Sequence, residues 1–333
     1  MSILILEEPQ SDFMIKPEGT FEAGEIPNEE NSSRPYARCL AASQRVQWDI
    51  DQDVFRGRSL DVGQKFLPDG LSQVQELEFL SPAGKQYLSQ IQGRTYVNMF
   101  HMAERFVNAK VLEISRDHWL GNQTALEALV RFSAEEVKHQ KMFGRLEQLA
   151  GEHMPPGYTF QPDPNEVAKV VLSKSAWAVL ALTHALELTS QRHYRHSMDS
   201  DDSLSPLFKD VFRYHWLEES QHAILDELEW KRLDRTMSWE AREQAVDEFI
   251  ELVGAVDGIL QVQAQADAEY FARTHGRPLP KEQHQALENG IRKAYRWQFI
   301  ISGAEHPHFM KVLTSLITER QGVRIQEALA DIS

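Results

Sequence analysis

The chain contains very little of several things that would place it in a specialised class. Its 333 residues include one cysteine, Cys39, so no internal disulfide can form. Glycine and proline number only 17 and 14, which excludes collagen-like and low-complexity sequences. The N-terminal segment has no basic region and too short an apolar run for a secretory signal. We therefore expect a cytoplasmic globular protein.

Basic residues and long apolar runs are also scarce. Lysine and arginine total 35 against 50 aspartates and glutamates, which gives a formal net charge of −15. This charge repels phosphate backbones and anionic membrane surfaces, so we expect neither nucleic acid nor a membrane as a partner. The nearest approach to a membrane span, residues 176–188, is shorter than the roughly 18 residues required and contains His184 and Glu187.

What the sequence does contain is a series of long helical patterns after a polar beginning. Residues 1–80 lack sustained periodicity, so we expect an extended leader that packs on the rest of the chain, with at most a short helix near its end. Three helix starts combine a capping residue with a following proline: Ser81-Pro82, Asp163-Pro164 and Ser205-Pro206. The predicted long helices are 82–117, 123–151, 164–198 and 205–233, and further helical patterns follow at 239–273, 281–303 and 307–319.

Two pairs of long helices separated by a longer link are typical of a four-helix bundle. Strand patterns are almost absent, so the predicted fold class is all-α. We expect residues 81–333 to form a single helical domain, with a core bundle at about 82–233 and accessory helices within 239–319 packed around it.

One stripe of the second predicted helix carries charge where apolar side chains are expected. The stripe, spaced by three and four residues, consists of Leu129, Phe132, Glu136, His139, Phe143, Leu146 and Ala150. Burial of Glu136 and His139 on this stripe would cost several kcal/mol unless they had a partner. Glu135 lies about 100° further round the helix, so Glu136 is the better candidate for a functional carboxylate.

The same pattern recurs further along the chain with identical spacing. In each half, a single glutamate precedes a Glu-x-x-His motif by the same interval: Glu104, Glu136 and His139 in the first half, and Glu187, Glu219 and His222 in the second. A histidine three positions before the first glutamate also recurs, as His101 and His184. A single Glu-x-x-His occurs by chance in many helices, whereas two in register with matched glutamates are a specific signal.

This constellation suits a pair of divalent metal ions inside a helical bundle. Such centres take one glutamate from each of two helices and Glu-x-x-His from each of the other two. Four carboxylates neutralise two doubly charged ions, and a mixture of carboxylate and imidazole favours iron or manganese over softer metals. The alternative, solvated charges on exposed helix faces, does not explain charged residues within apolar patterns.

The double motif resembles the ferritin-like di-iron carboxylate superfamily over residues 104–222. The fourth helix adds His215, giving His-x-x-x-Glu-x-x-His, and this extra histidine is similar to that of the p-aminobenzoate N-oxygenase-like di-iron oxygenases. The resemblance implies a ferritin-like bundle holding two iron ions, with manganese as the alternative metal. It also implies the ligands: Glu104, Glu136 and His139 for one ion, and Glu187, His215, Glu219 and His222 for the other, with Glu136 and Glu219 as bridges.

The resemblance further implies an O2-activating oxygenase that acts on a small organic substrate, by N-oxygenation of an arylamine or by hydroxylation. Its partners would be O2, that substrate and an electron donor. A homodimer is a further possibility that the sequence does not decide. A non-catalytic ferritin-like metal-binding protein is one alternative, which the roughly 100 residues after the fourth helix disfavour. An acyl desaturase-like di-iron oxidase is another, but it should present a basic docking patch, and the charge of −15 argues against one.

Several titratable residues receive no firm role from the sequence. Glu135 and Glu218 stand where the family resembled tends to have aspartate, and they are either partners of the opposing helix's histidine or solvated charges. His101 and His184 are interpreted as hydrogen-bonded bundle histidines. The segment 306–308, His-Pro-His, resembles a metal-binding cluster, but it more simply marks a helix start and is not assigned to a site.

Overall fold

The computed structural model describes residues 29–332, and this part of the chain is all-α, as the sequence predicts. Apart from an isolated bridge between Lys65 and Leu204, residues 29–332 contain no β-structure. No helix in the same range is long and apolar enough to cross a membrane. The α-helices are α1 (Glu29–Arg45), α2 (Asp69–Ser72), α3 (Pro82–Ser115), α4 (Gln123–His153), α5 (Pro164–Leu172), α6 (Ala176–His193), α7 (Pro206–Asp234), α8 (Trp239–Thr274), α9 (Lys281–Arg296), α10 (Ser302–Ala304), α11 (Pro307–Leu316) and α12 (Glu319–Ala330).

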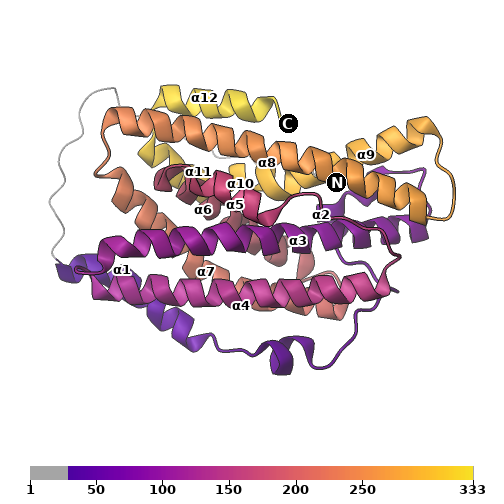
Figure 1. The fold of residues 1–333 in the computed structure, drawn as a ribbon, viewed down its shortest axis with the longest axis horizontal. Coiled ribbons are helices and arrows are strands. Elements are labelled where there is room, and N and C mark those ends of the chain that lie inside the picture. Colours follow the sequence, from indigo (N-terminus) through magenta and orange to yellow (C-terminus); the bar gives the residue numbers. More distant parts are fainter. Residues whose placement is uncertain (1–28, 333) are drawn as a thin grey trace, which may run out of the picture.

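Helices α3, α4, α6 and α7 form the central bundle. Helix α3 packs mainly against α4 and α6 mainly against α7, and α3 and α4 run side by side along the length of the molecule (Figure 1). Side chains cap these helices at the predicted starts: the Ser81 hydroxyl accepts the N–H of Gly84, and Asn122 accepts that of Ala125. The bounds of α3, α4 and α7 agree closely with the predicted helices.

The prediction of one continuous helix over residues 164–198 is wrong, because two helices, α5 and α6, occupy this segment. Helix α5 ends at Leu172, and Ser175 starts α6 by accepting the N–H of Ala178. A capping serine offers the backbone a competing hydrogen bond, which ends a helix locally despite an otherwise continuous pattern. Helix α5 packs against α3, so α6 alone supplies the third bundle helix.

The expectation of an extended leader is wrong for residues 29–45, which form α1. This helix packs against α4 and α7, while α8 lies on the other side of the bundle, against α6 and α3 (Figure 1). Pro35 falls inside α1 and weakened the helical signal in the sequence. Residues 1–28 of the leader lie outside the described part of the chain. Helix α12, which the sequence did not predict, covers α8.

A short polar layer divides the apolar core of the bundle into two clusters. Along α4, one cluster ends with Phe132, before Glu136, and the other begins with Met142, after His139. Helices α3 and α7 also pass from one cluster to the other partway along their length. Apolar packing therefore holds the four helices together on both sides of the polar layer and fixes the positions of the side chains within it.

Substitution of the fully buried Trp230 of α7 tests whether this packing stabilises the bundle. Its ring lies 5.2 Å from that of Trp177 on α6 and 6.1 Å from that of Phe309 on α11, so it joins three helices. We expect Trp230→Ala to lower the free energy of unfolding by about 3–5 kcal/mol in urea denaturation followed by circular dichroism. The matched control, Trp239→Ala, removes a side chain that is 45% exposed and should cost under about 1 kcal/mol. Equal losses in the two variants would contradict this account of the core.

Candidate metal centre

All seven residues that the sequence singled out are buried in the bundle. The structure brings six of them into two sets whose ligand-type atoms lie within 4.8 Å of one another, and Glu187 belongs to neither set but neighbours Glu219. Helix α3 provides one of the seven, α4 two, α6 one and α7 three, and none is more than 5% exposed. They are Glu104, Glu136, His139, Glu187, His215, Glu219 and His222. The apolar stripe of α4 is buried as predicted, so these charges do lie inside the bundle.

The two Glu-x-x-His motifs face each other across α4 and α7. Nδ1 of His222 lies 2.9 Å from Oε1 of Glu136 and 3.5 Å from Oε1 of Glu219. Nδ1 of His139 lies 3.6 Å from Glu136 and 3.5 Å from Glu219. Each of these four side chains offers an atom within 4.8 Å of the others, which is the spacing of groups that share bound cations.

Several of these buried atoms have no hydrogen-bond partner. Both carboxylate oxygens of Glu136, Oε1 of Glu219 and Nδ1 of His139 and His222 are enclosed and unsatisfied by any group of suitable geometry. Such atoms are costly inside a protein unless something else binds them. Divalent cations satisfy carboxylate oxygens and imidazole lone pairs together, so the residues present fit a pair of metal ions.

Glu135 and Glu218 hold the outward nitrogens of the two histidines. Nε2 of His222 donates to Glu135 at 3.0 Å, and Nε2 of His139 donates to Glu218 at 2.9 Å. Each bond crosses between α4 and α7 and leaves Nδ1 as the nitrogen that faces the cluster. The two glutamates are therefore not solvated helix-face charges, and the structure selects the first of the two interpretations offered by the sequence.

Residues from the leader and from the outer face of α4 support this arrangement, and no pattern in the sequence pointed to them. The Ser43 hydroxyl of α1 donates to Glu135, and Trp48 stacks on His139 with the rings 7° from parallel. Lys138 bonds Glu218 at 2.5 Å and lies over the Trp48 ring. The leader thus closes the outer side of the cluster.

His215 lies on the side of the cluster that contains Glu104. Its Nε2 is 3.1 Å from Oε1 of Glu104, and its ring is 4.6 Å from that of His139. Glu104, His139 and His215 form a second set whose atoms lie within 4.8 Å of one another. Burial lowers the pKa of His215 to about 4, so the imidazole is neutral at pH 7 and retains a lone pair.

Glu187 is the least compensated carboxylate of the layer. Burial, followed by the negative charge of neighbouring Glu219, raises its pKa well above the usual range. His139 shows the opposite trend: burial disfavours its charged form, but the carboxylates of Glu136 and Glu218 outweigh burial and raise its pKa to about 9. The layer thus has an excess of negative charge that cations would balance.

A helical bundle enclosing four carboxylates and three imidazoles in this arrangement is a ferritin-like di-iron carboxylate protein. Residues 79–293 match the family model described as p-aminobenzoate N-oxygenase AurF, and the chain belongs to that family. It is accordingly a non-haem di-iron oxygenase that activates O2. A solved structure of an R2-like ligand-binding oxidase variant with an aerobically reconstituted Mn/Fe cofactor is also similar, with 15% identity, 82% of this chain and 93% of that chain covered, and a TM-score of 0.41. No curated protein matched the chain.

The bond between Glu218 and His139 predicts a measurable effect on metal affinity. We expect Glu218→Leu to weaken binding of Fe(II) about 10- to 100-fold, because His139 would lose the partner that orients it. Titration against a competing chelator under anaerobic conditions measures this. Glu127→Leu on the exposed face of α4 is the control and should bind as wild type does. An unchanged affinity in Glu218→Leu would remove Glu218 from any role in the centre.

Proposed function

We propose that the seven buried residues of the polar layer are the ligands of the iron pair. The observation that carries this proposal is the set of enclosed, unsatisfied atoms on Glu136, His139, Glu219 and His222. Glu136 and Glu219 each lie near both histidines, which suits them to bridge the two ions. Two iron ions held by these residues would supply O2 activation for oxygen transfer to an organic substrate, with electrons from an external donor.

The grouping implied by the family resemblance needs one revision, which concerns His215. His215 and His222 are seven positions apart, or about 10 Å along a helix, with Glu219 between them. Both contact Oε1 of Glu219, His215 at 3.0 Å and His222 at 3.5 Å, and they approach it from opposite directions along the helix, which favours binding to different ions. The contacts of His215 with Glu104 and His139 favour one ion held by Glu104, Glu136, His139 and His215, and the other by Glu187, Glu219 and His222.

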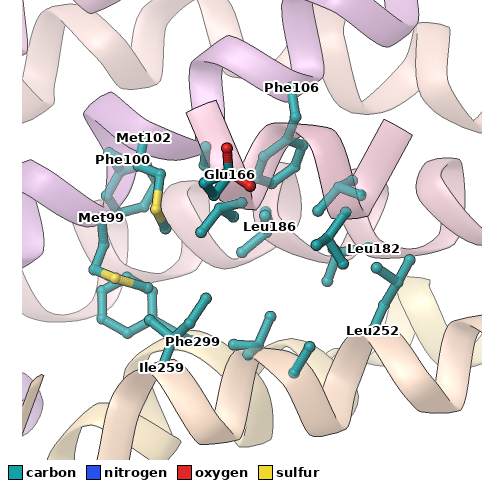
Figure 2. A pocket seen from close by; sticks show the side chains of 16 residues that line it. Met99, Phe100, Met102, Phe106, Glu166, Leu182, Leu186, Leu252, Ile259 and Phe299 are labelled. Atoms are coloured by element: carbon teal, nitrogen blue, oxygen red, sulfur yellow. The ribbon is translucent and has the colours of Figure 1, made fainter. Parts of the chain in front are cut away.

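An apolar cavity of about 260 Å³ beside this layer is suited to the substrate. Figure 2 shows Phe100 and Phe106 of α3 on one side of the space and Leu252 and Ile259 of α8 on the other. Phe100 connects the cavity with the metal ligands, because its ring packs edge-on against His215 at 5.5 Å between ring centroids. A small aromatic or aliphatic molecule matches this lining.

The lining also bears on the charge of the substrate. Among the cavity-lining residues of the described part of the chain, the one charged side chain is that of Glu166, and none is cationic. A carboxylate such as that of p-aminobenzoate would lose its hydration there without gaining a counter-charge. The proposed substrate is therefore a neutral arylamine or a similar apolar molecule, oxidised by N-oxygenation or hydroxylation.

Metal content and oxygen transfer test the proposed centre. We expect the anaerobically loaded chain to bind two irons, and Glu136→Ala or Glu219→Ala to lose most of that iron because each removes a shared ligand. Atomic emission measures the iron, and product labelling from isotopic O2 measures the transfer. Less than one iron per chain in wild type would contradict the ligand set, whereas two irons without any labelled product would contradict the oxygenase activity alone.

Filling the cavity tests the substrate site separately. Val256→Phe places a larger side chain against the cavity from α8, and we expect at least about a tenfold fall in kcat/KM for aniline with iron content unchanged. Val262→Phe, on an exposed position of the same helix, is the control. We also expect wild type to prefer aniline over p-aminobenzoate. A preference for the carboxylated substrate, or equal activity in the two variants, would place the substrate elsewhere.

A further inference from the structure

A second group of ligand-type side chains lies outside the di-iron layer, where α6, α7 and α11 meet. It consists of His184 from α6, Glu227 from α7 and His308 from α11, and each offers an atom within 4.8 Å of the others. Nε2 of His308 lies 2.7 Å from Oε2 of Glu227, and the rings of His184 and His308 are 5.8 Å apart. Neither the proposed iron ligands nor the lining of the cavity includes any of these three residues.

The orientation of His184 is the observation that distinguishes this group from an ordinary ion pair. Its Nδ1 donates to the backbone carbonyl of Ala223 at 3.0 Å, which leaves the lone pair on Nε2. That Nε2 is fully enclosed and has no hydrogen-bond partner. Histidines that bind metals commonly donate their other ring nitrogen to a backbone carbonyl in this way.

The charge of His184 agrees with this orientation. Burial lowers its pKa to about 4, so the ring is neutral at pH 7 and Nε2 remains an acceptor. Glu227 already has two partners: His308 contacts one of its carboxylate oxygens, and Lys231 donates to the other at 2.5 Å. These contacts satisfy the polar groups of Glu227, His308 and Lys231. They leave Nε2 of His184 unsatisfied, and a cation would satisfy it.

The internal repeat supplies a comparison within the same molecule. His184 and Glu227 of the second half correspond in register to His101 and Gly144 of the first. The counterparts also lie together, because a Cβ on Gly144 would be 3.3 Å from the His101 ring. The first half therefore also places the corresponding two positions side by side, but of the two halves only the second has a carboxylate there.

We propose that His184, Glu227 and His308 form a binding site for a single zinc-like divalent cation. Two imidazoles and one carboxylate are a ligand set that Zn²⁺ takes, with water in the fourth position. His308 is 45% exposed, so the ion reaches the site from solvent. Bound there, it would join α11 of the accessory layer to α6 and α7, the two bundle helices that carry Glu187, Glu219 and His222.

Zinc binding to the iron-loaded full-length chain tests the proposal. We expect one Zn²⁺ per chain in addition to the iron pair, with iron content unchanged and a higher unfolding temperature. Mutation of a residue that only hydrogen-bonds a metal ligand typically weakens metal binding about 10- to 100-fold. Removal of a ligand itself should weaken zinc binding by at least this factor. His308→Ala, on an exposed position, and His184→Leu should both show that loss, as measured by calorimetry and metal analysis.

Two controls make the result specific to these three residues. His101→Leu alters the repeat counterpart of His184 and should bind zinc as wild type does, as should the exposed-site variant His153→Ala. The proposal is overturned if no additional zinc binds, or if zinc enters only as iron leaves, which would place it in the di-iron layer. It is also overturned if His308→Ala and His184→Leu both bind zinc as wild type does.

Discussion

Burial of four carboxylates at the centre of an apolar bundle is the constraint on which the rest of the structure depends. Such a layer is unstable by itself, because each desolvated charge costs several kcal/mol unless an opposite charge lies beside it. Within residues 29–332, lysine and arginine approach only the outer carboxylates, as Lys138 does at Glu218 and Arg131 at Glu135. The inner four have only histidines as basic groups beside them, so the proposed metal ions would complete the fold of the centre as well as its chemistry.

The apolar clusters on either side of this layer make the arrangement rigid. Because core side chains pack at crystal-like density, α4 and α7 keep a fixed register, and the Glu135–His222 and Glu218–His139 bonds both depend on it. Each histidine is thus oriented by a glutamate of the opposing helix, and that glutamate immediately precedes the glutamate of the opposing Glu-x-x-His motif. A shift of one residue in either helix would break both bonds at once.

Helix starts and the internal repeat were predictable from the sequence because they depend on local signals and on spacing along the chain. The division between α5 and α6 was not, since one serine cap overrode an otherwise helical pattern. Contacts between distant segments could not be predicted either. Trp48 stacks on His139, and His308 contacts Glu227, but no periodic pattern in the sequence indicates these contacts. The division into a leader at residues 1–80 and one domain at 81–333 remains a prediction, as does a homodimer.

The two halves of the repeat differ at one position that matters for reactivity. His215 of the second half corresponds in register to Phe132 of the first, and each ring faces the histidine of the opposing motif. Phe132 stacks on His222 with ring centroids 3.9 Å apart, whereas His215 presents a nitrogen to Glu104. One side of the layer therefore has an extra donor and the other an apolar wall. Two ions in a symmetric ligand set would be equivalent, and in the proposed ligand set this exchange of phenylalanine for histidine would make them chemically distinct.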